Sequence, residues 1–322
     1  CISSAASDVY KRQQQTSLNL QVKGPFQLLG RRHELVLGAM RSRYSEDFYS
    51  YGREGAMPDT GSFYDWDGSY AQPNWTTTTL RDTITHQRGA YAAARWSLTD
   101  SLTLITGSRY ATWQSRSPTR DQKDSRLIPY AGVVYDINST YSAYASYTDI
   151  FQPQDYRDRS GNYLDPVEGQ NYEVGVKGEY LDGRLNASVA LFKVKESKTG
   201  VPDPGYMVPG STDGAYKTAD GVTTRGIEME VTGQLAPGWN TTLGGTYYTS
   251  RDVHGVSVNT ERPRATAMLF TTYRLPGAWN KLTVGGGVNW QISTYSTVEL
   301  DEGSVTAKQK ATALFNLCLL YT

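Results

Sequence analysis

The chain has 322 residues, of which 38% are hydrophobic, and its 32 basic side chains equal its 32 acidic ones. It has no apolar run near the roughly 18 residues that a transmembrane helix needs, so helical spanning of a membrane is excluded. The balanced and interspersed charge gives no support to a nucleic-acid partner, which requires a basic face. Tyrosine is frequent, with 24 residues against 7 Phe and 7 Trp, which favours surfaces that meet water and apolar groups together.

Both ends of the chain differ in pattern from the sequence beside them. Residues 1–13 (CISSAASDVYKRQ) and 318–322 (CLLYT) resemble translated sequencing-adapter DNA, and we interpret both as non-native; the alternative is that they are native. They hold the two cysteines, so residues 14–317 offer no disulfide or thiolate metal site. On this interpretation the chain is a fragment, and the signal peptide that export would require is not visible at its start.

Period-two runs bounded by turn residues predict about thirteen strands. In Tyr172–Tyr180, for example, valines and tyrosines alternate with Glu173 and Lys177, which predicts a lipid-facing and a wet face. The strands are expected, in chain order, at 15–23, 32–42, 83–98, 102–113, 126–135, 141–151, 170–180, 185–196, 224–233, 241–250, 264–273, 282–291 and 305–317.

The connections between these strands alternate in length. Short turns such as Leu181–Arg184, which contains Asp182-Gly183, alternate with polar connections expected to be long at 43–82, 114–125, 152–169, 197–223, 251–263 and 292–304. Bacterial outer-membrane barrels show this asymmetry, with short periplasmic turns and long external loops. The predicted fold is therefore all-β, an antiparallel transmembrane β-barrel of the outer membrane, present in part because an odd number of strands cannot close such a barrel.

Residues that could carry chemistry are few. His33, His86 and His254 have no metal-ligand spacing and no nucleophile partner, so a metal site or a hydrolase is poorly supported, and surface or lumen positions are expected instead. No catalytic residue and no protein metal ligand is predicted.

The first long connection threads many aromatic residues among charged ones. Such rings can stack on a flat ligand or on one another as a cap over the barrel, and both interpretations remain open. Further aromatic residues follow at the outer end of a strand, where a membrane girdle is the alternative, in a loop that also holds Arg157 and Arg159, and in the segment VPDPGYMVPG. The candidate ligand-binding residues are Tyr64, Trp66, Tyr70, Trp75, Trp113, Tyr156 and Tyr206.

Four long motifs carry a family resemblance: YDINSTYSAYASYTDIFQPQ, EGQNYEVGVKGEYLDGRLNASVALFK, GIEMEVTGQLAPGW and LTVGGGVNWQ. Together they resemble the barrel of TonB-dependent ferric-siderophore receptors, nearest to the ferripyoverdine and ferric-hydroxamate (coprogen, rhodotorulate) branch. The resemblance implies a barrel of about 22 strands, plugged by an N-terminal domain, that binds an iron chelate outside and imports it.

The resemblance also implies the partners: a ferric siderophore, the TonB-ExbB-ExbD system acting through the plug, and outer-membrane lipid. No cofactor is implied, because iron arrives within its chelate. The chain departs from the family pattern in having no plug, no TonB-contacting segment and no final aromatic residue. The alternative functions are a passive porin or structural barrel and an outer-membrane hydrolase, for which no nucleophile and histidine pair is evident.

Overall fold

The computed structural model describes residues 11–53, 62, 64, 74–219, 221–300 and 303–321. These residues fold almost entirely into antiparallel strands, interrupted by a short 3-10 helix, η2 (Gly277–Trp279). No helix among them has the length and apolar character that crossing a membrane would require.

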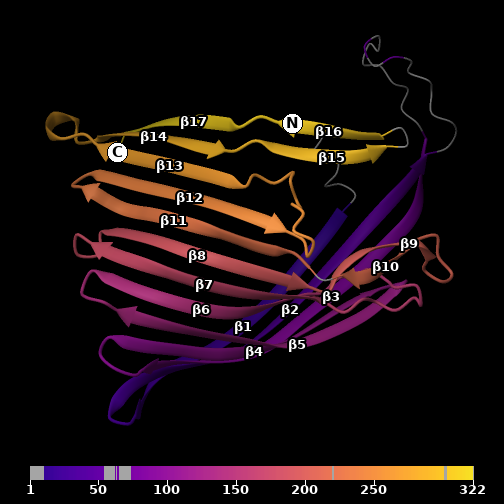
Figure 1. Ribbon diagram of the computed structural model, residues 1–322, viewed down its shortest axis with the longest axis horizontal. Helices are drawn as coiled ribbons and strands as arrows, with labels where there is room; N and C mark the ends of the chain where they lie inside the picture. The colour runs from indigo at the N-terminus through magenta and orange to yellow at the C-terminus, as the bar shows by residue number, and fades with distance from the viewer. Residues whose placement is uncertain are drawn as a thin grey trace. The chain divides into compact units, whose positions relative to one another are not determined.

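Thirteen strands form one sheet in which nearly every strand lies beside its predecessor in the chain (Figure 1). Their order is β1 (Lys11–Leu28), β2 (Arg31–Arg53), β3 (Trp75–Ser97), β4 (Leu102–Ser117), β5 (Arg120–Asp136), β6 (Tyr141–Gln152), β7 (Val167–Tyr180), β8 (Leu185–Ser197), β11 (Thr223–Ala236), β12 (Trp239–Arg251), β13 (Ala265–Arg274), β14 (Leu282–Gln291) and β17 (Thr312–Tyr321). Two separate hairpins, β9 (Thr199–Met207) with β10 (Gly214–Ala219) and β15 (Thr294–Leu300) with β16 (Gly303–Gln309), lie in long connections.

The predicted number and order of sheet strands are confirmed, and the long connection predicted at 197–223 lies between β8 and β11 with the β9–β10 hairpin inside it. Three other predicted connections have wrong bounds. The connection at 114–125 is a tight turn, because β4 runs to Ser117 and β5 begins at Arg120. The connection predicted at 43–82 is shorter, because β2 runs to Arg53 and β3 begins at Trp75. The connection predicted at 292–304 is longer and contains a hairpin, because the predicted strand 305–317 is divided between β16 and β17. Strands that continue beyond lipid have polar residues on both faces, so they give no apolar period-two signal.

By its internal contacts the chain divides into two units, the first comprising residues 1–22, 37–91 and 110–127 and the second residues 23–36, 92–109 and 128–322. In the second unit, strand register aligns apolar side chains in rows across the sheet. Val176 of β7 pairs with Val189 of β8, which pairs with Met229 of β11, and all three are exposed. One residue along, Ser188 pairs with Glu230 on the other face. A slip of one residue would exchange the two faces, so lipid on one side fixes the register.

Aromatic pairs border this apolar face at both ends of the strands. Tyr141 and Tyr180 meet edge-to-face near the short turns, with ring centroids 5.8 Å apart, and Tyr147 and Tyr172 meet near the long loops at 5.2 Å. From Tyr172 to Tyr180 the strand rises about 26 Å, or about 20 Å along the membrane normal at a tilt of roughly 40°. This height approaches the apolar band of outer-membrane barrels, which confirms the two-faced prediction.

His33 is buried near a short turn of the second unit, contrary to the expected surface or lumen position. Its Nδ1 accepts a hydrogen bond from the Ser97 N–H at 3.0 Å, so its Nε2 donates to the Leu28 carbonyl at 3.1 Å. Its ring packs against Phe26 and Trp96, with centroids 5.2 and 5.6 Å away. The imidazole therefore joins β2 to β3 and to the end of β1 and has a structural role.

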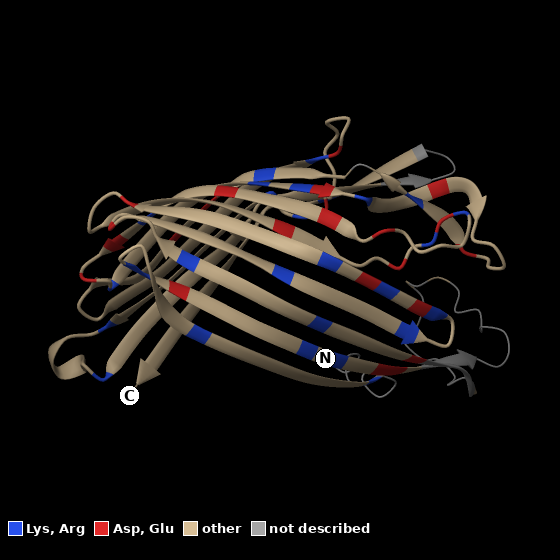
Figure 2. Ribbon diagram, turned by 90° about the horizontal axis from the view of Figure 1, so that it is seen from below, with Lys and Arg blue, Asp and Glu red and all other residues tan. Residues whose placement is uncertain are grey.

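In the first unit the two faces of the strands are also distinct. The Ser17 hydroxyl of β1 donates to the Ser42 hydroxyl of β2 at 3.1 Å on the polar face. On the same face of β2, the ring of Tyr91 from β3 covers the backbone of Gly38 so closely that a Cβ there would overlap the ring. Leu18 and Leu20, which alternate with Ser17, are exposed on the opposite face. Charged residues lie along the strands as well as in the loops (Figure 2), as expected where one face is wet.

Candidate ligand-binding site in the long loops

Two long connections of the second unit pack into one structure, which we call the loop module: residues 153–166, between β6 and β7, and residues 198–222, between β8 and β11. The Tyr216 N–H donates to the Arg157 carbonyl at 2.8 Å. Three apolar residues of the module, Leu164, Val208 and Ala215, are buried. The sheet, by contrast, exposes most of its large apolar residues.

A buried glutamine, Gln154, fastens the two connections together. Its Nε2 donates to the carbonyls of Asp165 and Lys198, the latter at 2.8 Å, and its Oε1 accepts from the Gly200 N–H at 3.0 Å. The side chain is 9% exposed, so these backbone groups have little water to replace it. Gln154 therefore acts as a clasp between the first connection and the start of the hairpin.

Lys198 strengthens the same junction by charge. Its Nζ donates to Glu168 at 2.7 Å and to Asp165 at 3.2 Å. The hydrogen bond to Glu168, followed by that to Asp165, raises the pKa of Lys198 above its usual value. Lys198 also has positive φ, at 59°, and at this point the chain turns from β8 into the hairpin.

Two of the predicted ligand-binding residues lie in this module. The Tyr156 ring stacks on Tyr216 at 4.1 Å with an interplanar angle of 19°, while 40% of Tyr156 stays exposed. Tyr206, which is 47% exposed, lies 3.9 Å from the guanidinium of Arg159, and Arg159 is paired with Asp203 at 2.8 Å. The module thus presents rigid aromatic faces beside oriented charges, a combination suited to a flat or charged organic ligand.

Of the other predicted residues, Trp113 and Tyr64 belong to the first unit. Trp113 of β4 lies in the first unit, where the Arg120 guanidinium is 5.3 Å from its ring. Tyr64 is 94% exposed, with its N–H donating to the Ser62 hydroxyl at 3.3 Å. Trp75 begins β3, but its side chain is outside the described residues, as are Trp66 and Tyr70.

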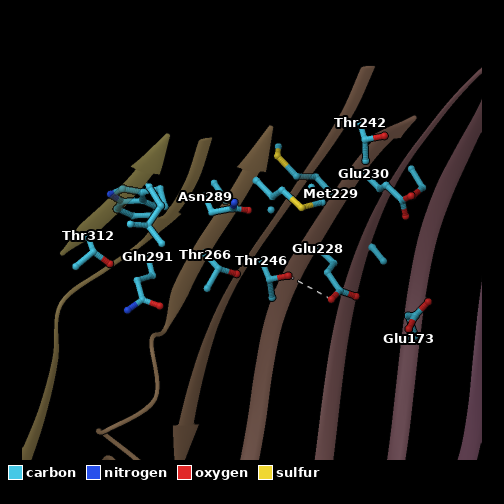
Figure 3. Close-up of a pocket in the computed structure, with 18 of the residues that line it drawn as sticks. Glu173, Glu228, Met229, Glu230, Thr242, Thr246, Thr266, Asn289, Gln291 and Thr312 are labelled. Atoms are coloured by element: carbon cyan, nitrogen blue, oxygen red, sulfur yellow. Dashed lines mark hydrogen bonds between the residues drawn. The ribbon is translucent and has the colours of Figure 1, made fainter. Parts of the chain in front are cut away.

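Apart from the loop module, the second unit has a recess of about 910 Å³ on the polar face of its sheet (Figure 3). Glu173 accepts a hydrogen bond from the Tyr144 hydroxyl, and Glu228 accepts one from Thr246 at 3.2 Å. Figure 3 shows the carboxylates of Glu173, Glu228 and Glu230 projecting from the same side of the sheet. Lys177 lines the same recess, and the alternation of the sequence predicts Glu173, Glu228 and Glu230 on the wet face of the sheet.

The described ranges hold no group of three or more His, Cys, Asp or Glu residues arranged to bind a metal ion. The contacts that shape the loop module were also missed in the sequence. Gln154 and Asp203 are isolated polar residues in polar segments, so no sequence pattern indicates their role. Arg159 is indicated only by its closeness to Tyr156 in the sequence. Asp203 is 5% exposed in spite of its charge, because Arg159 and Lys217, from separate segments, pair with it.

Comparison with known proteins decides the family. Residues 3–321 match the family described as "TonB dependent receptor-like, beta-barrel". The chain belongs to this family. It is 43% identical over 290 residues to the ferripyoverdine receptor of Pseudomonas aeruginosa and 39% identical over 306 residues to the ferric-pyoverdine 358 receptor of Pseudomonas putida, covering 88% and 89% of the chain. It spans only 36% of the length of each of these relatives.

Solved structures agree with the sequence relatives. The ferripyoverdine receptor of the outer membrane of Pseudomonas aeruginosa, bound to ferripyoverdine, superposes with a TM-score of 0.88 at 40% identity, over 97% of this chain and 43% of that one. The chain is thus part of an outer-membrane β-barrel of a Gram-negative bacterium, as predicted. Its family and relatives are transport receptors and not enzymes, and the comparisons give no support to the porin alternative.

Proposed function

We propose that the protein to which this chain belongs is an outer-membrane receptor that binds a ferric siderophore at its external face and imports it. The observation that carries the proposal is the 43% identity, over 88% of the chain, to a receptor named for ferripyoverdine. Energy would come from the TonB-ExbB-ExbD system acting through a plug domain; the family name supports the dependence on TonB. The substrate class suggested by the relatives is a ferric pyoverdine or a chelate of similar chemistry.

Within this chain, the loop module is the part best suited to hold such a ligand. Tyr156 and Tyr206 present ring faces, and the ion pair of Arg159 with Asp203 offers polar groups whose positions are already fixed. Preorganised groups lose little conformational entropy on binding. The siderophore supplies the oxygen ligands of Fe(III), so the receptor needs no cofactor and no metal ligands of its own. Tyr64, Trp66, Tyr70, Trp75 and Trp113 remain further candidates.

The proposal is tested with the full-length receptor in its native host or in a host lacking other siderophore receptors. Titration with ferripyoverdine should give saturable binding, and iron uptake should require TonB. We expect Tyr156→Ala and Tyr206→Ala each to weaken binding about tenfold, the order of an aromatic contact with a ligand. Tyr273→Ala, on the opposite, lipid-facing side of the sheet, is the matched control and should bind as wild type.

Two outcomes would contradict the proposal in different ways. TonB-independent permeation of small solutes, with no saturable chelate binding, would favour a passive porin. Normal binding by both tyrosine variants would leave the receptor function intact but exclude the loop module as the site. In that case Tyr64→Ala with Trp66→Ala becomes the next variant, because both residues lie in the aromatic first connection.

The interpretation of residues 1–13 and 318–322 as non-native is a separate hypothesis. Residues 318–321 continue β17, where Cys318 pairs with Gly285 of β14. Sequencing the source locus across both ends tests it directly, because the natural sequence should replace these strings. Their presence in genomic DNA would contradict it.

A further inference from the structure

One buried carboxylate of the loop module holds two cations side by side. Asp203 of β9 is 5% exposed, and each of its oxygens has its own partner. Oδ2 lies 2.8 Å from Nη2 of Arg159, which belongs to the connection 153–166, and Oδ1 lies 3.2 Å from Nζ of Lys217, which belongs to β10. We call Arg159 and Lys217 the cation pair. Segments far apart in the chain thus bring two positive charges to one place.

The backbone around Asp203 fixes where its carboxylate lies. Pro202 and Pro204 flank it in the chain, and each pyrrolidine ring locks its own φ near about −65°. In the β9–β10 hairpin, Lys217 pairs with Val201. Asp203 is two residues beyond Val201, so Lys217 is its diagonal neighbour on the same face of the hairpin. Stiff backbone and hairpin register therefore set this contact before any ligand arrives.

The positive charge of this cluster is its exposed part. The side chains of the cation pair are 52% and 56% exposed, whereas that of Asp203 is 5% exposed. Two adjacent cations repel each other and a buried carboxylate is costly without partners, so each kind of charge stabilises the other here. Two positive charges and one negative charge leave a net charge of +1. In the described part of the chain, no second carboxylate lies within ion-pair distance of the cation pair.

Both cations keep hydrogen-bond donors for a further partner. Guanidinium and ammonium groups each have several N–H donors and no acceptor. Arg159 donates to Asp203 through Nη2. Its guanidinium also lies over the Tyr206 ring, 3.9 Å from the centroid, and this contact covers a face of the guanidinium without using a donor. Because Tyr206 is itself 47% exposed, the cluster presents fixed donors beside an accessible ring.

We propose that the cation pair receives a carboxylate of the ferric chelate, while Tyr206 contacts the adjoining part of the same ligand. The inference rests on the proposed function and names the chemical group that the site selects. A carboxylate is matched to the site because its two oxygens can accept hydrogen bonds from both cations at once. A neutral amide in its place has one oxygen, and its N–H would face other donors. The site thus discriminates between chelates by charge, and Asp203 is its positioning residue.

The test uses the full-length receptor and a ferripyoverdine that carries a free carboxyl group. The second probe is the same ferripyoverdine after its carboxyl group has been converted to the methylamide, so that the two probes differ in one charge. Titration gives the Kd of each probe, and the ratio of the two values is the readout. We expect the wild-type receptor to bind the carboxylate about tenfold more tightly, the order of a hydrogen bond between charged groups. Lys217→Met and Arg159→Met should each bring the ratio close to one.

The ratio separates recognition of charge from folding, because damage to the module would weaken both probes alike. Lys217→Arg keeps the charge and should keep the preference. The matched control is Lys281→Met, which removes an exposed lysine at the short turn before β14 and should also keep it. Equal binding of both probes by the wild type would overturn the inference, as would an unchanged preference in both methionine variants of the cation pair. If neither probe gave saturable binding, the proposed function itself would be contradicted, and the inference with it.

Discussion

Replacing Gln154 by alanine should release the loop module without disturbing the barrel. The Gln154 amide hydrogen-bonds the carbonyls of Asp165 and Lys198 and the Gly200 N–H. Its removal takes away the side-chain partner of three backbone groups at a position that is 9% exposed. The strands of the barrel keep their own hydrogen-bond ladders, because Gln154 lies two residues beyond the end of β6 at Gln152.

The size of the effect follows from these contacts. A neutral hydrogen bond contributes about 1 kcal/mol net, and a buried group left without a partner costs about 1–3 kcal/mol. Water can enter part of the space that the side chain leaves, so we expect a loss of about 2 kcal/mol in the stability of the module. That loss corresponds to about 30-fold more frequent opening of the loops. The Gln154→Glu variant should open at least as often, because a carboxylate would face two carbonyl oxygens.

Hydrogen–deuterium exchange with mass spectrometry measures this opening in the full-length receptor. Peptides covering residues 153–166 and 198–219 should exchange about 30-fold faster in the variant, while peptides from β7 and β8 should not change. The control is Gln170→Ala, because Gln170 is exposed and hydrogen-bonds tyrosine side chains of the sheet, Tyr172 at 3.2 Å and Tyr147. Unchanged exchange in both loop peptides would refute the role of Gln154 in holding the two connections together. Faster exchange throughout the barrel would show that the substitution destabilises the whole structure and not the module alone.

Three further predictions concern other contacts. Gly200→Ala should destabilise the loop module, because the new Cβ would lie 2.6 Å from the Tyr156 ring. This overpacking should cost about 1–3 kcal/mol and should appear as faster hydrogen exchange and weaker ligand binding. Normal exchange together with normal binding would contradict the close packing of Gly200 against Tyr156. The pKa of Lys198 is raised, so its ion pairs stabilise the module fully below the usual lysine pKa and are lost as the pH rises through the folded-state pKa. Proteolysis of the loops by an alkaline protease should therefore increase only above about pH 10.5. The Lys198→Met variant should show no such pH dependence. His33→Ala should lower the free energy of unfolding, measured in urea and detergent, by about 2 kcal/mol, because two hydrogen bonds and the ring packing are lost. His254→Ala, in an exposed loop, should leave it unchanged. Equal unfolding midpoints for the two variants would refute the structural role of His33.

The alternation of side chains determined most of the barrel from sequence alone. Val174 and Val176 alternate with Glu173 and Lys177 because a strand turns successive residues to opposite sides, and lipid on one face makes that rule visible. The rule is local, so it also predicted the number and order of the sheet strands. It failed where β4 and β5 leave the membrane, because Gln122 and Asp124 alternate with other polar residues and no apolar face remains.

The site depended on contacts that no local rule contains. Arg159 and Asp203 are far apart in the chain and share no pattern, yet their pairing places Tyr206 beside a charge. In the sequence, nothing distinguishes Gln154 from other loop glutamines, because its backbone partners come from distant parts of the chain. The sequence by itself determined which residues face lipid and which face water, because that depends on neighbours along the strand. The tertiary structure alone decided which loop residues meet, because their partners come from strands that only the folded sheet brings together.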